Sequence, residues 1–301
     1  MLDILIIGGG PAGLAAAIYA ARARLSCTVA EKGFAGGGAV AVTETVDNYP
    51  GLPGISGFEL GERFLGHAKM LGAEIVTAEA AAINFSANGF TTLFADGSAI
   101  SSKTVIYAAG TSRRRLEIDG ETLPGVSYCA TCDGAFFSGK IVAVIGGGDT
   151  ALTEALYLSR TAAKVYLIHR RAEFRANAAL AEQVKNAANI ELVLNAVPTR
   201  ILGKTSVGGI EVSRGGKSEK LVADGVFVAI GAAPNTEILR GTVTLDERGY
   251  IPADESGVTS LGGFFAAGDV RAKSVRQVIT ACADGACCVD SVERHLAALP
   301  R

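Results

Sequence analysis

A glycine-rich turn near the start of the chain, Gly8-Gly9-Gly10-Pro11-Ala12-Gly13, constrains the fold more than any other feature of the sequence. It follows an apolar run at 2–7 and precedes an Ala-rich helical stretch at 14–23. A second apolar run at 27–30 then ends at Glu31. Strand, tight turn, helix and strand in this order predict a βαβ unit in a parallel sheet.

The same order returns near the middle of the chain. An apolar run at 141–145 precedes the turn Gly146-Gly147-Gly148-Asp149-Thr150-Ala151, and a helical stretch follows at 152–161. The next apolar run, 165–168, ends at His169. Two such units in one chain predict an α/β fold with two Rossmann-like dinucleotide-binding domains. Further short apolar runs end at glycines, among them Gly110, Gly231 and Gly268, and a long helix is expected at 277–299.

Composition narrows the class of protein. The chain has 301 residues, of which 49% are hydrophobic, and this is enough apolar area to exclude disorder as the main state. The 28 basic and 30 acidic residues give a formal net charge of −2, so no nucleic-acid partner is expected. The longest uncharged stretch, 4–21, is broken by the first glycine-rich turn, and Asp3 lies where a signal peptide carries basic residues. We therefore expect a cytoplasmic protein without a membrane span.

Gly8, Gly10 and Gly13 match the pattern GxGxxG. The first glycine allows a tight turn, the second lets the backbone approach a pyrophosphate, and the third lets the helix pack on the strand. Glu31 ends the next strand, where an acid hydrogen-bonds a ribose hydroxyl. Two nucleotide sites in one chain suggest that one holds FAD and the other a nicotinamide nucleotide, with hydride passing between them. An acid suits a ribose without a phosphate, so we expect FAD at this turn, and the alternative is an ordinary glycine-rich βα turn.

Gly146, Gly148 and Ala151 match the related pattern GxGxxA. Where the first unit has an acid, this unit has His169-Arg170-Arg171, followed by Arg175. Arginines bind a 2′-phosphate through bidentate, charge-assisted hydrogen bonds, which predicts NADPH and not NADH. The alternative is a solvated run of basic residues.

A CxxC motif, Cys129-Ala130-Thr131-Cys132, lies just before the second unit. Zinc needs four ligands, and the sequence has neither a second CxxC nor a His near this motif, so no metal is expected. The remaining interpretation is a redox-active disulfide that exchanges electrons with the flavin. Asp133 follows the motif and is a candidate proton donor or acceptor for the sulfurs, or else a turn residue before Gly134.

These motifs together resemble the low-molecular-weight, bacterial-type thioredoxin reductases, which belong to the FAD/NADPH pyridine nucleotide-disulfide oxidoreductases. The resemblance covers the whole chain and rests on Cys129-Ala130-Thr131-Cys132-Asp133-Gly134, on the second glycine-rich turn, and on His169-Arg170-Arg171 with Arg175. Asn48-Tyr49-Pro50-Gly51 resembles a flavin-side loop of that family. Gly268-Asp269-Val270, with Arg276-Gln277, resembles its C-terminal FAD contacts.

The resemblance implies a discontinuous FAD-binding domain, 1–112 and 241–301, with an NADPH-binding domain inserted at 113–240 that carries the CxxC. It implies hydride transfer from NADPH to FAD, reduction of a Cys129–Cys132 disulfide, and thiol–disulfide exchange with thioredoxin. Cys132 would be the sulfur nearer the flavin. Family members are homodimers, and they rotate one domain against the other during turnover.

The motifs and the resemblance together give a set of expected cofactor contacts. They are Gly8, Gly10, Pro11, Ala12, Gly13, Glu31, Lys32, Gly38, Ala39, Asn48, Gly110, Gly268, Asp269, Arg276, Gln277, Gly146, Gly148, Asp149, Thr150, Ala151, His169, Arg170, Arg171, Arg175 and Gly231. Three positions depart from the family pattern: Ala39 replaces a Gln, Ala109 a Thr and Ala232 a His. Each departure removes a polar group near an expected cofactor.

Alternatives stay open for the function and for the remaining cysteines. The same CxxC would serve a flavoprotein dithiol oxidase or a reductase of another small redoxin, and a nucleotide-binding redox sensor without turnover is a third possibility. Cys282, Cys287 and Cys288 lie near the expected flavin end of the last helix. They are either small buried side chains or an auxiliary thiol relay.

Overall fold

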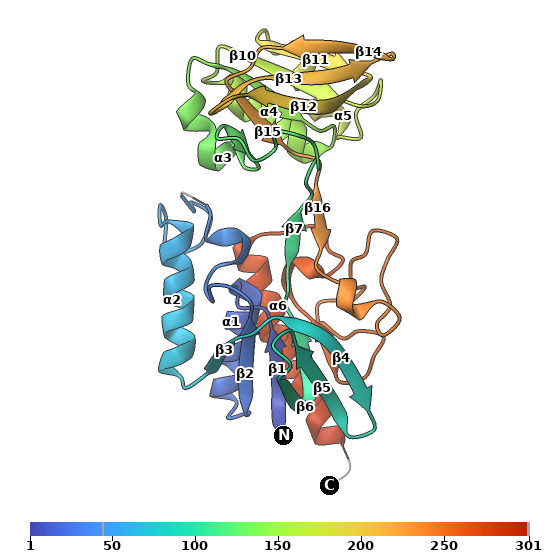
Figure 1. Cartoon of the computed structure of the whole chain (residues 1–301). Coiled ribbons are helices and arrows are strands. Elements are labelled where there is room, and N and C mark those ends of the chain that lie inside the picture. The colour runs from blue at the N-terminus through green and yellow to red at the C-terminus, as the bar shows by residue number, and fades with distance from the viewer. Residues whose placement is uncertain (44, 300–301) are drawn as a thin grey trace. The chain divides into compact units, whose positions relative to one another are not determined.

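The structure is a computed structural model that describes residues 1–43 and 45–299, apart from the side chains of Thr131 and Cys132 (Figure 1). The chain folds into two compact units. Unit 1 contains Met1–Ser112 together with the chain from Ala233 onward, and unit 2 contains Arg113–Ala232. The two connecting segments, β7 (Thr111–Arg113) and β16 (Ala232–Pro234), pair with each other.

Unit 1 is built on a seven-stranded sheet with the order β3-β2-β1-β6-β5-β4, and β17 pairs with β6. Strands β1, β2, β3, β6 and β17 run parallel, whereas β4, β5 and β6 form an antiparallel meander. The strands are β1 (Leu2–Ile7), β2 (Cys27–Glu31), β3 (Glu74–Thr77), β4 (Ala80–Ser86), β5 (Gly89–Phe94), β6 (Ala99–Tyr107) and β17 (Phe264–Ala266).

Three helices cover one face of this sheet: α1 (Pro11–Arg22), α2 (Gly57–Met70) and α6 (Val278–Ala298) (Figure 1). Side chains alternate between the faces of β1, as expected for a strand. Ile4 and Ile6 therefore pack with residues of the three helices, whereas Leu5 and Ile7 pack with Tyr107 on the opposite face. Short 3-10 turns, η1 (Gly38–Val40), η3 (Glu237–Leu239) and η4 (Gly268–Val270), complete the unit.

Unit 2 has a five-stranded parallel sheet and a separate three-stranded antiparallel sheet. The parallel order is β11-β10-β9-β15-β8, from β8 (Val126–Ser127), β9 (Ile141–Ile145), β10 (Lys164–His169), β11 (Ile190–Leu194) and β15 (Gly225–Val228). The antiparallel sheet contains β12 (Ala196–Gly203), β13 (Val207–Arg214) and β14 (Lys217–Leu221). The helices are α3 (Ala130–Asp133), η2 (Gly134–Phe137), α4 (Asp149–Ser159) and α5 (Ala178–Asn186).

The α/β class and the two dinucleotide-type units predicted from the sequence are confirmed. Helices α1 and α4 begin at Pro11 and Asp149, three residues earlier than the apolar pattern indicated. The reason is that Gly10 and Gly148 already serve as their N-caps. The chain rejoins unit 1 at Ala233, before the boundary of 241 expected from the sequence. Asn235 explains this, since its side chain donates to the Ala109 carbonyl at 2.8 Å.

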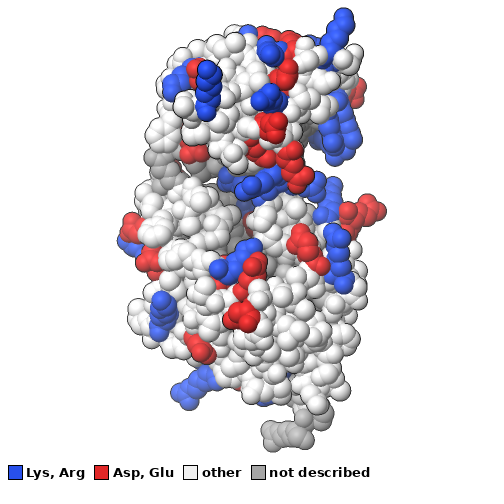
Figure 2. All heavy atoms as spheres, in the orientation of Figure 1, with Lys and Arg blue, Asp and Glu red and all other residues white. Residues whose placement is uncertain are grey.

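The distribution of surface charge and the character of the helices bear on the expected partners. On the face shown in Figure 2, acidic and basic side chains of unit 1 are interspersed with wide uncharged areas, in keeping with the near-neutral net charge. Within the described ranges, no helix combines the length and the apolar character needed to cross a membrane.

Candidate functional site

The first glycine-rich turn connects β1 to α1, and its glycines are required for two different reasons. A Cβ atom at Gly8 would lie 2.3 Å from the Ala108 carbonyl oxygen, and one at Gly13 would lie 1.8 Å from the Gly8 carbonyl oxygen. The fold itself therefore requires these two glycines. A Cβ at Gly10 would meet no atom of the described residues within 4 Å. Gly10 thus faces open space at the N-terminus of α1, where backbone N–H groups bind phosphate.

Glu31 lies at the carboxyl end of β2 and binds the turn directly. Its carboxylate accepts hydrogen bonds from Gly9 N–H at 2.7 Å and from Gly33 N–H at 2.9 Å. A carboxylate has about four acceptor positions, so these two bonds leave capacity for a ligand hydroxyl. The sequence predicted the ligand contact, and the structure adds a role in holding the turn.

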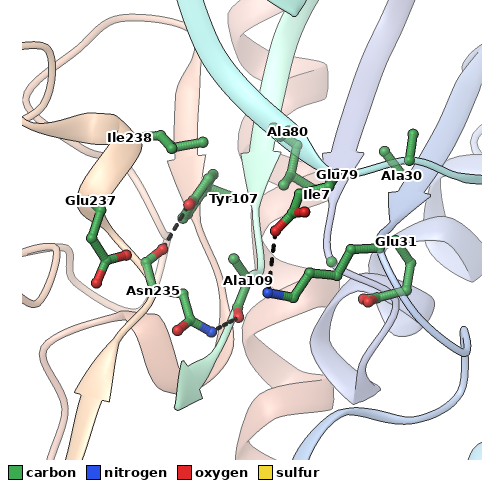
Figure 3. A pocket seen from close by; sticks show the side chains of 13 residues that line it. Ile7, Ala30, Glu31, Glu79, Ala80, Tyr107, Ala109, Asn235, Glu237 and Ile238 are labelled. Carbon is green, nitrogen blue, oxygen red and sulfur yellow. Dashed lines mark hydrogen bonds and ion pairs between the residues drawn. The ribbon is translucent and has the colours of Figure 1, made fainter. Parts of the chain in front are cut away.

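A cavity of about 170 Å³ opens in unit 1 at the carboxyl ends of β1, β2 and β6 (Figure 3). Nucleotides bind at this edge of parallel α/β sheets. Its wall includes Glu31, Lys32, Glu79, Tyr107 and Asn235, and Lys32 forms an ion pair with Glu79. The Tyr107 hydroxyl donates to the Asn235 carbonyl oxygen at 2.7 Å. Asn235 therefore ties this wall to β6, a role that no local sequence motif indicated.

Asp269 and Arg276 carry buried polar atoms that lack partners in the described part of the chain. These atoms are Asp269 Oδ1 and Arg276 Nε. Burial raises the pKa of the Asp269 carboxyl. A Cβ at Gly268 would lie 2.9 Å from Ala12 Cβ, so this segment lies beside the start of α1. A buried acceptor and a buried donor without partners suit a polar ligand, and they fit the hydroxyl and phosphate groups of FAD.

The η4 segment that carries Asp269 is anchored by an acid on α6. Asp284 accepts a hydrogen bond from Gly268 N–H at 2.9 Å, and it pairs with Arg271 and Lys273 at 2.8 Å each. All three charged side chains are largely buried. Because a buried charge is costly unless it is paired, this cluster fixes η4 against α6. Asp284 was not predicted, because its partners are distant in sequence.

Two loops of unit 1 meet at the start of α6. The Asn48 side-chain amide donates to Gln277 Oε1 at 2.9 Å, and Gln277 is the N-cap of α6. Gly38 and Ala39 lie in η1, where Ala39 is exposed and has no polar side-chain atom for a cofactor. The structure thus brings Asn48 and Gln277 together, and it leaves the position of the expected family glutamine without an amide.

The second glycine-rich turn repeats the logic of the first in unit 2. A Cβ at Gly146 would lie 2.4 Å from the Ala229 carbonyl oxygen and 2.6 Å from Ala151 Cβ, whereas one at Gly148 would meet nothing within 4 Å. Asp149 Oδ1 accepts from Asn177 N–H at 2.8 Å, and the exposed Thr150 follows it in the first turn of α4. Open space again faces a helix N-terminus.

The basic segment after β10 divides into one buried residue and three exposed ones. His169 is buried, and its Nε2 lies 3.1 Å from the Glu173 carbonyl oxygen. Burial first, and then the charges of the three nearby arginines, lower the pKa of His169. Arg170, Arg171 and Arg175 are exposed, and none of them takes part in an ion pair described in the structure. Three unpaired cations at this edge fit a 2′-phosphate.

Gly110 and Gly231 lie in the two segments that connect the units. Both have positive φ angles, 63° and 96°. The Gly110 carbonyl accepts from Asn235 N–H at 3.1 Å, and the Gly231 carbonyl accepts from Arg114 N–H at 3.0 Å. Both glycines therefore shape the connections, and their expected cofactor contacts remain predictions.

Cys129 is disulfide-bonded. The side chain of Cys132, its expected partner, lies outside the described residues, so the pairing and the order of the two sulfurs remain predictions. The Cys129 N–H donates to Ser127 Oγ at 3.0 Å, and the Ser127 hydroxyl donates to Asp133 Oδ2 at 2.6 Å. Asp133 is thereby held beside Cys129 in the segment 129–134, which is called the disulfide turn. Sequence reasoning found Asp133 but missed Ser127, because a lone Ser carries no motif.

The other four cysteines are free. Burial raises the pKa of Cys282 to about 11 and that of Cys288 to about 12, and both lie on α6. Their thiolates are therefore scarce at neutral pH, which favours the interpretation of small buried side chains over a thiol relay for these two. Cys287 is exposed, so the prediction of a buried side chain is wrong at that position. No group of three or more His, Cys, Asp or Glu among the described residues is arranged to hold a metal ion.

Two glycine-rich turns and a disulfide turn in one chain define a nucleotide-dependent disulfide oxidoreductase. Residues 2–285 match the family model for pyridine nucleotide-disulphide oxidoreductases, and the chain belongs to this family. Within that class, the chain is similar to thioredoxin reductases, as the sequence motifs predicted.

Three relatives illustrate this similarity. The thioredoxin reductase of Mycolicibacterium smegmatis is 42% identical over 302 residues, covering 98% of this chain and 96% of the relative. The bifunctional thioredoxin reductase/thioredoxin of Mycobacterium leprae is 41% identical over 98% of this chain and 66% of its own length. The Lactococcus lactis thioredoxin reductase structure in its FR conformation has a TM-score of 0.81 at 34% identity, covering 99% of this chain and all of that one.

Proposed function

We propose that the protein is an NADPH-dependent thioredoxin-disulfide reductase. The observation that carries the proposal is the disulfide-bonded Cys129 in a chain with two glycine-rich nucleotide turns, one in each unit. The Mycolicibacterium smegmatis thioredoxin reductase is 42% identical and the Lactococcus lactis one is 34% identical, which supports the same activity for this chain.

FAD is proposed to bind unit 1. The open space at Gly10, the carboxylate of Glu31, and the unpartnered atoms of Asp269 and Arg276 would hold it. When bound, the flavin accepts two electrons from a nicotinamide and passes them to a disulfide. The chain itself contributes the rigid turn, the buried polar groups and the Asp284 cluster that keeps η4 in place.

NADPH is proposed to bind unit 2. The N-terminus of α4 at Gly148 would receive the pyrophosphate, and the exposed Arg170, Arg171 and Arg175 would receive the 2′-phosphate. Because the arginines are cationic and have no ion-pair partner among the described residues, they favour a phosphorylated ribose over an unphosphorylated one.

Asp133 is proposed to move the proton that thiol–disulfide exchange requires. The carboxylate accepts the Ser127 hydrogen bond and lies at the end of the four-residue helix that begins after Cys129. A carboxyl held at this position can donate a proton to a departing thiolate and accept it from an attacking thiol. The same proposal includes three further points. Cys132 is the sulfur nearer the flavin, the chain forms a homodimer, and the protein is cytoplasmic.

The test is an anaerobic titration of the purified protein with NADPH, followed by addition of a panel of thioredoxins. The proposal expects NADPH to bleach the visible flavin band and expects a thioredoxin disulfide to restore it. Oxygen-dependent disulfide formation in a small dithiol, without reduction of thioredoxin, would indicate a dithiol oxidase. A flavin band that NADPH leaves unchanged would exclude both enzymatic activities and leave a redox sensor.

A further inference from the structure

Glu154 on α4 is a carboxyl group of unit 2 to which the proposed function gives no role. Its Oε2 atom is shielded from solvent and has no hydrogen-bond partner in the described part of the chain. The great majority of buried polar atoms in proteins have a partner. An unpartnered carboxyl oxygen at this depth therefore calls for an explanation.

The Glu154 carboxyl contacts the backbone of the disulfide turn. It accepts a hydrogen bond from Ala130 N–H, which belongs to the peptide directly after Cys129. The turn packs tightly on α4 at this point, since a Cβ at Gly134 would lie 2.9 Å from Leu158 Cδ2. The hydrogen bond thus places the carboxyl next to the Cys129 backbone, and the packing at Leu158 holds α4 against the turn.

Two carboxyl groups consequently lie against the disulfide turn in different environments. Asp133 accepts a hydroxyl hydrogen bond from Ser127, whereas Glu154 Oε2 accepts none from the described residues. Burial raises the pKa of Glu154 to about 7, and the Ala130 N–H and the Arg113 guanidinium oppose this rise. Neighbouring carboxyls with separated environments are the arrangement by which enzymes assign acid and base roles at one site.

Other ionisable groups on elements packed against α4 are few. Cys129, Cys132 and Asp133 lie on the disulfide turn, and β9 carries no ionisable residue. The remainder are Asp149 and Tyr157 on α4 itself, Lys164, Tyr166 and His169 on β10, Glu182 and Lys185 on α5, and Glu191 on β11. Of the charges in unit 2, the Arg113 guanidinium is the one that shifts the pKa of Glu154.

We propose that Glu154 is a positioning residue that sets how much of the reduced Cys129 is present as reactive thiolate. This inference rests on the proposed function in taking Cys129 as a redox sulfur. An ionised Glu154 beside the Ala130 peptide repels a thiolate on the adjacent residue, and a protonated Glu154 does not. The two groups therefore titrate as a coupled pair.

The proton and electron balance of the reduced state is simple. Two electrons break the S–S bond and give two thiolates, which take up two protons to become two thiols. In turnover the electrons come from NADPH, and in the test below they come from dithiothreitol, which is oxidised to its cyclic disulfide and releases two protons. Glu154 supplies no electrons and forms no bond to sulfur.

The test measures the reactivity of Cys129 in Glu154→Gln, which removes the charge and keeps an oxygen acceptor for Ala130 N–H. The matched control is Glu182→Gln, the same change at an exposed helical position of unit 2. The full-length protein with its cofactor is reduced by dithiothreitol, and the rate of carboxamidomethylation of Cys129 is followed by peptide mass spectrometry from about pH 6 to pH 9.

The Cys132 thiol of the reduced protein also titrates, so the comparison is between variants. Glu154→Gln is expected to lose one of the ionisations that the wild type and Glu182→Gln show in the pH profile of Cys129, with a rate about tenfold higher near pH 7.5. Glu154→Asp, which keeps the charge, is expected to retain the ionisations of the wild type. If Glu154→Gln shows the same profile as the wild type, or if Glu154→Gln and Glu154→Asp change the profile equally, Glu154 has a packing role only and the inference fails.

This readout does not require thioredoxin or NADPH. A protein that fails to reduce thioredoxin but shows the expected Cys129 profiles would overturn the proposed function and leave the role of Glu154 intact. A protein that reduces thioredoxin with the same Cys129 profile in wild type and Glu154→Gln would do the reverse. The wild-type profile is informative even if Glu154→Gln does not fold.

Discussion

The Ser127 hydroxyl donates a 2.6 Å hydrogen bond to Asp133 Oδ2 and accepts one from Cys129 N–H at 3.0 Å. Ser127 is buried at the end of β8, so its hydroxyl has a fixed position. One hydroxyl thus connects the sulfur-bearing residue to the carboxylate proposed as its proton donor. The disulfide turn is therefore organised by a residue outside the CxxC itself.

Ser127→Ala should lower thioredoxin-dependent turnover by about tenfold, because Asp133 loses its hydrogen bond and its orientation. It should also lower the free energy of unfolding by about 1–2 kcal/mol, since the partners of the hydroxyl are left without it. Steady-state kinetics and denaturant unfolding measure the two effects. Ser138→Ala, at an exposed position after the same turn, is the control and should change neither. Full turnover in Ser127→Ala would contradict the proposed role.

Gly10→Ala and Gly13→Ala should separate ligand binding from folding. A Cβ at position 13 collides with the Gly8 backbone at 1.8 Å, so Gly13→Ala should destabilise the apoprotein by about 3 kcal/mol or more. A Cβ at position 10 meets no protein atom, and Gly10 has a φ of −81° that Ala adopts, so apoprotein stability should change by less than about 0.5 kcal/mol. Only flavin retention should fall.

The measurements are denaturant unfolding of the apoproteins and the flavin-to-protein absorbance ratio after gel filtration. If Gly10→Ala retained flavin as well as the wild type does, the pyrophosphate would not lie at this turn. Comparable losses of apoprotein stability in both variants would also contradict the distinction.

Arg170→Ala combined with Arg171→Ala should raise the KM for NADPH by at least about tenfold and leave the KM for NADH nearly unchanged. Each charge-assisted hydrogen bond to a phosphate contributes about 1.5–3 kcal/mol, and NADH has no 2′-phosphate to lose. Arg160→Ala removes an exposed arginine from the same unit at the C-cap of α4, and it should leave the preference intact. An unchanged NADPH/NADH ratio in the double variant would show that other residues select the cofactor.

Cys282 and Cys288 should resist alkylation near pH 8, whereas the exposed Cys287 should react. Burial raises the pKa of Cys282 to about 11 and that of Cys288 to about 12, so the thiolate fraction of each is small at that pH. Peptide mass spectrometry of the oxidised protein after carboxamidomethylation gives the extent at each site. A variant with Ser at positions 282, 287 and 288 should keep full turnover. A large loss of kcat without loss of stability would instead support a thiol relay.

Sequence analysis predicted the parts of the site that are contiguous in the chain. The roles of Gly8, Gly10 and Gly13 follow from one short pattern, and the structure gives each glycine the environment that the pattern requires. Glu31 followed from its position at the end of the next strand. These inferences could be made from the sequence because a βα turn brings its own residues together, whatever the rest of the chain does.

Residues that depend on distant pairing were not predictable in this way. Asn235 lines the pocket and bonds to Ala109, and Asp284 anchors Gly268 through a cluster that assembles only when α6 packs against η4. In the sequence, Glu154 looks like any acidic residue on an exposed helix. Its burial depends on how the disulfide turn lies against α4. The roles of these residues come from tertiary packing, which the patterns of a single sequence do not predict.

Gly10 and Gly148 differ from the other turn glycines in what maintains them over evolutionary time. A Cβ at either position would meet no atom of the described residues within 4 Å, so the proposed nucleotide is the group that requires glycine there. Gly8, Gly13 and Gly146 are required by the backbone whether or not a nucleotide is present. A descendant of this chain that abandoned one of its nucleotides would keep the architecture of that turn, while the glycine at position 10 or 148 would be free to drift.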